Sequence, residues 1–562
     1  MSINGSLQVG RSALLASQAA LQVAGNNMAN ASTPGFHRRT IQLTPQTTEA
    51  VGRNARVGRG VQINSIRREI DSGLQARLRD AISNQNQALM NQRFLTSIET
   101  LQNELTDNDL STTLSRFFNS FSELSNTPED SAVRALVVQE GVVLADRIAT
   151  MRGDYSRVIG EVDNEITATV RSINDLLERT AEANAQIVNT EATSGEESSL
   201  RDLRDQLIDE LAEYVEVDVI EHPSGSTDIL INSIPVLLAG INRGVEVRKE
   251  SVGDALEVSI RVADDGTTLD VNTGRLGGLI GQRDGTVSPV IDQLNTFAKE
   301  LIFQVNRIHS QGQGELGFEQ LVGTTMLDDT SAALNSTNSG LPFTIENGSF
   351  FVHVTHQETG IRSAFQVTAN GDTDSLDDII TRLNATVPDM VASVGLGSTL
   401  RMDASPGYEL SFSNDTSGAL AALGVNTFFT GQSAADIDVH AELIADPQRL
   451  SADTGHISGN GGTAVTIAEL QDVAQSALGN STLREFWQDS VNKLAVRSNA
   501  ANNAVESTGL VTESLNAQVQ AVSGVSIDEE SLNLLTFQRQ FQAAARFINV
   551  IDETLQTLLS IV

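Results

Sequence analysis

The stretch "LLTFQRQFQAAARFINVIDETLQTLLSIV" (residues 534–562) decides the predicted fold. Its apolar residues recur every three or four positions, which is typical of a helix that packs along one face against a partner. We call this apolar stripe the seam, and it consists of Leu534, Phe537, Phe541, Ala544, Ile548, Ile551, Leu555, Leu558 and Val562. Asp528, Glu529 and Glu530 come just before it, where negative charge favours the start of a helix. The sequence therefore predicts a C-terminal helix with one apolar face.

The other end of the chain shows a matching pattern over residues 3–28. Large apolar residues recur every seventh position, and a small residue follows each of the first three after three positions. The large residues are Leu7, Leu14, Leu21 and Met28, and the small ones are Gly10, Ser17 and Ala24. A row of small residues permits close approach by another helix, and Pro34 with Gly35 ends the helical pattern. Both ends are thus predicted to be seam-forming helices.

The middle of the chain alternates between helical and strand patterns. No proline occurs from Glu129 to His222, which permits long helices there. Alternating β-branched and polar residues then predict strands over 214–270 and again over about 318–430, where "FFVHVTH" and "YELSFS" are the clearest. We therefore expect an α+β multidomain fold, with a discontinuous helical shaft built from both chain ends and β-rich outer domains inserted in the middle.

The expected segments follow from these changes of pattern. They are an N-terminal segment 1–70 that pairs with 523–562, a helical shaft 71–213, an outer β-rich region 214–270, a helical shaft segment 271–313, a second outer β-rich domain 314–463, a helical shaft return 464–522, and the C-terminal helix 523–562.

The charge of the chain is unevenly spread. The net charge is −35, yet the first 100 residues hold 11 Arg and 5 Asp or Glu for +6, which leaves −41 for the rest. The basic residues of this part include Arg38, Arg39, Arg53, Arg56, Arg59, Arg67 and Arg68. They lack the interleaved aromatic residues of a base-stacking platform, and the overall charge opposes phosphate binding. We expect no nucleic acid partner, and contact of Arg38 and Arg39 with acidic surface on a neighbouring protein.

Targeting and redox features are also absent from the sequence. The chain has no cysteine, which excludes disulfides and thiolate metal sites. Its first 20 residues lack a basic start followed by an apolar run, so we expect no cleavable signal peptide. No stretch approaches the roughly 20 apolar residues of a membrane span.

Motifs for catalysis or ligand binding are weak. "GQGELG" (residues 312–317) follows a helical pattern rather than a strand, so a loop that ends a helix is favoured over a nucleotide site. His353 and His356 fall on opposite faces of a predicted strand, which disfavours shared metal ligation. In "NGDTDSLDD" (residues 370–378), Ser375 and Asp378 have the spacing of a helix cap rather than of a calcium loop. The sequence predicts no enzyme, no cofactor and no metal.

The two ends resemble one protein family. "NNMANASTPGF" (residues 26–36) resembles the N-terminal signature of bacterial flagellar rod, hook and hook-associated proteins, and Gly25 and Ser32 depart from it. "GVSIDEESLNLLTFQRQFQAAARFINVIDETLQTLL" (residues 524–559) is similar to the closing helix of that family, with Ser526 as a departure. Three central blocks resemble a hook-associated member: residues 274–312, "LRDQLIDELAEYVEVDV" and "SGALAALGVNTFFTGQSAADIDV".

This resemblance implies a structural role at the junction between hook and filament, needed for flagellum-dependent motility. Segments 1–70 and 523–562 would form the axial inner tube, in a ring of identical subunits between hook protein and a second junction protein. The resemblance also implies an extracellular location, export without a cleavable signal peptide, and an export chaperone in the cytoplasm. The implied subunit interface consists of Asn26, Asn27, Asn30, Thr33, Gly35, Phe36 and the seam residues Leu534, Phe537, Phe541, Ile548, Ile551, Leu555 and Leu558.

Two other classes stay open on the sequence. One is a different axial protein of the rod or hook type, and the other is an exported adhesin or enzyme with axial-type ends. In each class the seam alone does not offset the backbone entropy of so long a helix, so we predict ends that are disordered in the free monomer and fold on assembly.

Overall fold

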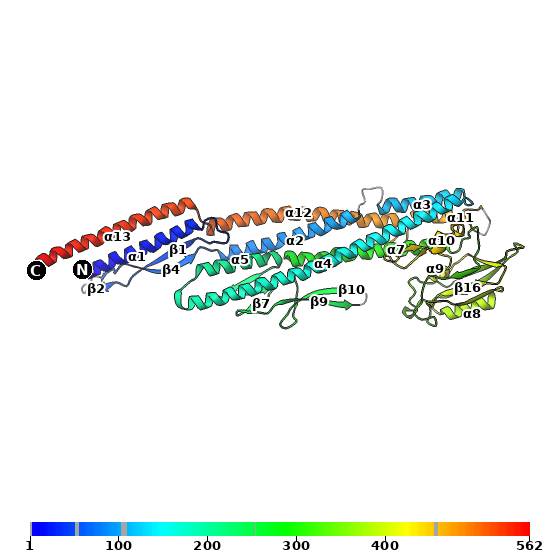
Figure 1. Ribbon diagram of the computed structural model, residues 1–562, viewed down its shortest axis with the longest axis horizontal. Coiled ribbons are helices and arrows are strands. Elements are labelled where there is room, and N and C mark those ends of the chain that lie inside the picture. Colours follow the sequence, from blue (N-terminus) through cyan, green and yellow to red (C-terminus); the bar gives the residue numbers. More distant parts are fainter. Residues whose placement is uncertain (1–2, 51–55, 103–108, 253–254, 455–458, 562) are drawn as a thin grey trace. The chain divides into compact units, whose positions relative to one another are not determined.

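The structure, a computed structural model, describes residues 3–50, 56–102, 109–252, 255–454 and 459–561. Helices form both ends of the described chain, and the strands of the middle are inserted between them (Figure 1). The predicted α+β fold class is confirmed. Contacts divide the chain into two compact units, each made of separate stretches: Met1–Phe94, Val162–Arg283 and Ala500–Val562 form the first, and Leu95–Glu161 and Asp284–Asn499 form the second.

The first unit contains the helix pair formed by the two ends. Helix α1 (Ile3–Ala29) packs along α13 (Ile527–Ile561), and the two run side by side in Figure 1. They are antiparallel, since Gly10 lies against Ile548 whereas Asn27 lies against Glu530. The predicted small residues are buried, Ser17 at 6% and Ala24 at 1% exposure, so the close approach inferred from them is confirmed.

A β-hairpin follows α1, and the sequence patterns had not indicated it. Strands β1 (Arg39–Pro45) and β4 (Val61–Arg68) are antiparallel with a bulge between Gln42 and Leu43, and both contact α1. The short pair β2 (Glu49–Ala50) and β3 (Arg56–Val57) continues the hairpin. Arg53, one of the basic residues noted above, lies outside the described residues.

Helices form most of the rest of the first unit's frame. They are α2 (Ser72–Gln102), α4 (Ser131–Ser194), α5 (Ser198–Tyr214), α6 (Gly274–Gln282) and α12 (Leu483–Ser523), of which α2, α4 and α12 continue into the second unit. The 64 residues of α4 agree with the absence of proline from this stretch. Helices α2 and α12 pack through Leu74, Leu78 and Val519.

Two antiparallel sheets occupy 218–269, as the alternating pattern predicted. The first has the order β5-β6-β7-β8 and the second the order β11-β10-β9. Their strands are β5 (Asp218–Glu221), β6 (Thr227–Ile231), β7 (Ile234–Leu238), β8 (Ile241–Asn242), β9 (Val245–Val252), β10 (Ala255–Val262) and β11 (Thr268–Leu269).

The second unit has a phenylalanine-rich core around helices α3 (Leu110–Asn126) and α7 (Ser288–His309). Phe117 and Phe121 of α3 pack edge to face against Phe428. A π-helical turn, η1 (Arg283–Val287), joins α6 to α7 along the chain. The other helical elements are α8 (Leu376–Thr386), α9 (Ala419–Ala422), α10 (Ala441–Ala445), α11 (Gly462–Glu469) and the 3-10 turns η2 (Thr337–Ser339), η3 (Pro447–Arg449), η4 (Leu470–Asp472) and η5 (Ser476–Leu478).

Small antiparallel sheets complete the second unit. Their orders are β12-β16-β15, β14-β13-β17 and β18-β19. The two strands predicted most clearly, within β13 and β17, are direct neighbours, with His353 opposite Ser411. The strands are β12 (Gln320–Val322), β13 (Gly348–His356), β14 (Arg362–Ala369), β15 (Met390–Val394), β16 (Leu400–Ala404), β17 (Tyr408–Ser413), β18 (Phe429–Thr430) and β19 (Asp438–Val439).

Candidate functional site

The two end segments are joined by a buried hydrogen-bond network around Asn27. Asn27 near the end of α1 is 1% exposed, and Glu530 in the first turn of α13 is 3% exposed. Asn27 Nδ2 donates to Glu530 Oε2 at 3.2 Å and to the Arg39 carbonyl at 2.9 Å, while Asn27 Oδ1 accepts from Arg39 N at 3.0 Å. All of the side chain's strong groups are therefore used within the chain, which is what a buried amide requires.

Arg38 supplies the charge that a buried carboxylate needs. Its Nε donates to Glu530 Oε1 at 2.9 Å, and its Nη1 donates to Glu529 Oε2 at 3.0 Å. Its backbone N donates to the carbonyl of Ser523 at 2.8 Å, which fixes the loop beside the end of α12. Glu530 also lies at the positive end of the α13 dipole, so two effects stabilise its negative charge.

A second charged cluster holds the same loop against α5. Asp202 Oδ1 lies 2.8 Å from His37 Nδ1 and accepts from Arg68 Nη1 at 3.0 Å, and Asp202 Oδ2 accepts from Arg39 Nη2 at 3.3 Å. Burial would raise the pKa of the Asp205 carboxyl, but the charge of Arg68, 2.7 Å away, and those of its neighbours outweigh burial and lower that pKa.

The expected contact of Arg38 and Arg39 with a neighbouring protein is therefore wrong. Both guanidinium groups pair with acidic residues of the same chain, Arg38 with α13 and Arg39 with α5. The net charge of the rest of the chain pointed to an acidic partner, but it could not distinguish this chain's own carboxylates from those of another copy.

The loop between α1 and β1 presents the other signature residues at the surface. Asn30 Nδ2 donates to the Asn26 carbonyl at 2.9 Å, and Thr33 N donates to the Asn30 carbonyl at 2.9 Å, so the run ends the helix as predicted. Gly35 has a φ of +74°, a conformation that suits glycine, and Phe36 is half-buried with Arg39 above its ring. Asn26, Thr33 and Gly35 are exposed, and only Asn27 of this set is fully buried.

The seam of α13 faces α1 but is incompletely covered. Ala544 and Ile551 are each 8% exposed, while Leu558 is 45% exposed. The half-buried members are Leu534, Phe537, Phe541, Ile548 and Leu555, and Val562 lies outside the described residues.

The opposite side of α13 also exposes apolar residues, and the sequence analysis did not predict them. Leu532, Leu535 and Val550 are 66%, 50% and 59% exposed. Their spacings of 3 and 15 residues return to one side of a helix, opposite Phe541. We call this side the outer face of α13. The signal in the sequence is a second set of apolar residues with helical spacing, on the side of the helix opposite the seam.

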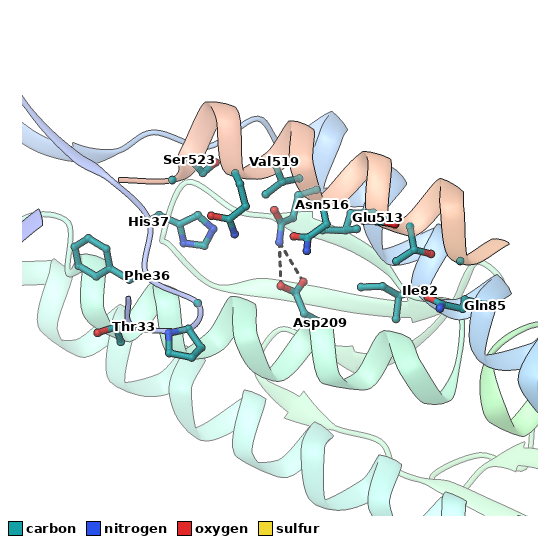
Figure 2. Close-up of a pocket in the computed structure, with 18 of the residues that line it drawn as sticks. Thr33, Phe36, His37, Ile82, Gln85, Asp209, Glu513, Asn516, Val519 and Ser523 are labelled. Atoms are coloured by element: carbon teal, nitrogen blue, oxygen red, sulfur yellow. Dashed lines mark hydrogen bonds between the residues drawn. The ribbon is translucent and has the colours of Figure 1, made fainter. Parts of the chain in front are cut away.

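A pocket of about 950 Å³ lies beside the loop that follows α1. Figure 2 shows α12 along one side of the pocket, with Glu513 and Asn516, and Asp209 of α5 on the other side. Asp209 accepts hydrogen bonds from Gln75 and Arg79, so its charge is already compensated. Phe36 and His37 from the loop also line the pocket.

The weak sequence motifs lie elsewhere, and each has a structural role. His353 Nε2 lies 2.8 Å from Ser413 Oγ, and burial together with the charge of Arg362 lowers the pKa of His353 to about 4. His356 packs edge-on against Tyr408, as expected for a packing histidine. Residues 312–317 form the loop after α7, and Ser375 with Asp378 forms a capping box on α8, so both predictions are confirmed.

Within the described ranges, no three metal-binding side chains come together. None of the described helices is both long and apolar enough to cross a membrane.

Comparison with known sequence families gives three matches along the chain. The "Flagella basal body rod protein" family matches residues 7–37, and the "Flagellar basal body rod FlgEFG protein C-terminal" family matches residues 518–561. The "Flagellar hook-associated protein FlgK helical domain" family matches residues 95–321. The two end matches cover the helices that meet at Asn27 and Glu530.

Similar whole proteins are also known. Flagellar hook-associated protein 1 of Bacillus subtilis (strain 168) is 24% identical over 99% of this chain and 97% of its own length. The protein of the same name from Escherichia coli (strain K12) is 24% identical over 98% of each chain.

The structure of the flagellar hook junction protein FlgK from Burkholderia pseudomallei has a similar fold. The TM-score is 0.51 at 15% identity, over 80% of this chain and all of the other. The chain is therefore similar over nearly its whole length to flagellar hook-associated protein 1, and its ends and middle match families of flagellar rod and hook-associated proteins, which identifies it as a structural component of the bacterial flagellum.

Proposed function

We propose that this chain forms the junction between hook and filament of a bacterial flagellum. It assembles as a ring of identical subunits on the distal end of the hook, so that a second junction protein and then the filament can attach. Its role is structural rather than enzymatic. It reaches this extracellular position by export, escorted in the cytoplasm by a chaperone.

The observation that carries this proposal is the two-sided apolar character of α13. One side packs on α1 within the chain, and the outer face leaves Leu532, Leu535 and Val550 at least half exposed. A helix that is apolar on two opposite sides is expected to be buried on both. Neighbouring subunits in a closed axial assembly supply that second burial.

In this assembly each segment of the chain has its own place. Segments 1–70 and 523–562 form the inner tube, and the exposed residues Asn26, Thr33 and Gly35 contact the next subunit. The helical segments 71–213, 271–313 and 464–522 form the shaft. The β-rich regions 214–270 and 314–463 project outward.

A rod or hook protein is the second candidate function, because two of the family matches are to rod proteins. Self-polymerisation separates the two. A hook-type protein forms long tubes from purified protein alone, whereas a junction protein adds a limited layer to an existing hook end.

Electron microscopy of isolated hook–basal bodies, mixed with the purified and gold-labelled protein, tests the proposal. Labels confined to the distal hook tip are expected. Labels along the rod, or long tubes of labelled protein, would assign the chain to the other class. Complete absence of labels with well-folded protein would contradict an axial position.

A further inference from the structure

The outer face of α13 carries two exposed arginines. Arg539 and Arg546 lie on the same side of the helix as Leu535 and Val550, by the 3.6-residue period. Across all described residues, neither arginine takes part in a hydrogen bond or ion pair. Among the described residues, the opposite side of α13 packs on α1, whereas Leu535, Arg539, Arg546 and Val550 on this face are exposed.

A complementary pair of charges lies on α12. Glu506 and Glu513 line the pocket beside the loop that follows α1, and both are exposed (Glu513 is labelled in Figure 2). Like the two arginines, they form no hydrogen bond or ion pair with any part of the chain that the structure describes. Between them lie Gly509, which adds no side chain to the groove, and Leu510, which is 62% exposed.

We propose that the outer face of α13 in one copy of this chain packs against the groove-lining face of α12 in a second copy. Arg539 and Arg546 are seven residues apart, as are Glu506 and Glu513, so each pair spans about 10.5 Å at 1.5 Å per residue. Each arginine can therefore lie opposite a glutamate whether the two helices run parallel or antiparallel. This inference rests on the proposed assembly of identical subunits and names one of its contacts.

Apolar contact and charge have different roles in this interface. Exposed ion pairs add little affinity each, so burial of the exposed apolar residues of the two faces supplies most of the attraction; these are Leu510 on α12 and Leu535 and Val550 on α13. The two charge pairs set the register, because a helix displaced by one turn would leave each carboxylate beside an apolar residue.

Charge reversal tests the proposed contact in the full chain. The double variant Glu506→Arg and Glu513→Arg is expected to reduce gold labels at hook tips at least tenfold, and Arg539→Glu with Arg546→Glu should do the same. Combining all four changes restores the charge pairs and should restore labelling. The matched control is Glu161→Arg with Glu182→Arg, two exposed glutamates of α4 with the same change in net charge. Failure of the fourfold variant to recover labelling, or equal loss in the control, overturns the inference.

Cross-linking supplies a second measurement, made possible by the absence of cysteine. Leu510→Cys in one sample and Ala543→Cys in another place a thiol midway between each charge pair. After mixing at high concentration, with and without hook–basal bodies, oxidation should give a mixed dimer, whereas Glu182→Cys with Ala543→Cys should not. Absence of the mixed dimer under both conditions overturns the inference.

The two proposals fail separately. If wild-type protein labels hook tips but the mixed dimer is absent, the junction role stands and the helix contact is wrong. If the mixed dimer forms but hook tips stay unlabelled, the contact stands and the junction role is wrong.

Discussion

Asn27 of α1 donates a hydrogen bond to Glu530 of α13 across 3.2 Å, and the two residues are 503 positions apart in the chain. Both side chains are almost fully buried, and the same amide also holds the backbone of Arg39. The two segments that resemble one protein family thus meet at a single asparagine. This places the two ends of the chain in one folding unit.

Replacement of Asn27 should weaken assembly. Asn27→Ala leaves Glu530 and both backbone groups of Arg39 short of a buried partner, at a cost of about 1–3 kcal/mol. We expect at least a tenfold drop in labels per hook tip. Asn26→Ala, one residue away but exposed, serves as the control and should label normally. Equal labelling by the two variants would show that the network is dispensable.

A charge in the seam should abolish assembly while the rest of the protein stays folded. Phe541→Asp or Leu534→Asp places a carboxylate where α13 faces α1, and a half-buried charge without a partner is strongly disfavoured. Circular dichroism should show the long helices retained, and swimming should be lost. Gln542→Asp, on an exposed neighbouring position, is the control. Normal motility in the seam variants would contradict the assigned role of the seam.

The free monomer should be cleaved first at its two ends. Much of α13 is exposed when only α1 covers it, so both helices should open more readily than the second unit. Limited proteolysis of the purified chain, followed by mass spectrometry, is expected to remove residues near 1–30 and 527–561 before any other cut. Protection of both ends in the monomer would count heavily against folding on assembly.

The second unit should lose stability in mild acid because of His309. Its Nδ1 lies 2.9 Å from the Asn426 carbonyl and its Nε2 accepts from Ser451 N, so the buried ring is neutral. Burial, together with the charges of His440 and Arg134, lowers the pKa of His309 from 6.5 to about 4, although the hydrogen bond to the Asn426 carbonyl acts in the opposite direction. As the pH falls, the His309 ring is therefore protonated in the unfolded chain at a higher pH than in the folded chain. The contribution of neutral His309 to the free energy of unfolding is therefore complete above about pH 6.5. The free energy of unfolding falls by about 3 kcal/mol as the pH drops to 4.

Trp487 allows the stability of the second unit to be measured by itself. It is the only tryptophan, lies in the second unit and is 1% exposed. Urea unfolding followed by its fluorescence at several pH values should show the loss, and His309→Gln should show a smaller pH dependence. An identical pH profile for both proteins would exclude His309 as the cause.

Asn384 should protect an edge strand from pairing with other molecules. Its amide donates to the Ala392 carbonyl at 2.8 Å and accepts from Ala392 N at 2.7 Å, on the open side of β15. Asn384→Ala exposes these backbone groups, which should cost about 1–3 kcal/mol and increase aggregation. Light scattering of the variant against Thr381→Ala, an exposed change on the same helix, measures this. Matching scattering curves would mean that another feature protects the edge strand β15.

The sequence predicts most of the elements because their signals are local. The seam, the acidic residues at 528–530 and the alternation over 218–269 each reflect neighbours along the chain, and these elements are present as expected. The hairpin of β1 and β4 was not predicted, because each strand is only 7 or 8 residues long and its alternation of apolar and polar residues is interrupted by arginines.

The site was predicted only in part, for a different physical reason. The role of Asn27 depends on Glu530, and that of Arg39 on Asp202, 163 positions away. No periodicity links such distant residues. In the block 417–439, which resembles the family, Asn306 Oδ1 accepts from Phe428 N and Phe429 N, and these bonds attach the block to α7.

Gly10 allows α1 and α13 to approach each other closely. A Cβ atom at this position would lie 2.7 Å from Ile548 Cγ1 and 3.1 Å from Phe547 Cδ1, so even alanine would push α13 away from α1. In the closed ring of identical subunits proposed above, that shift would be repeated in every copy, and the repeats would add around the circumference. The missing methyl group at Gly10 would then help to set the inner diameter of the proposed tube.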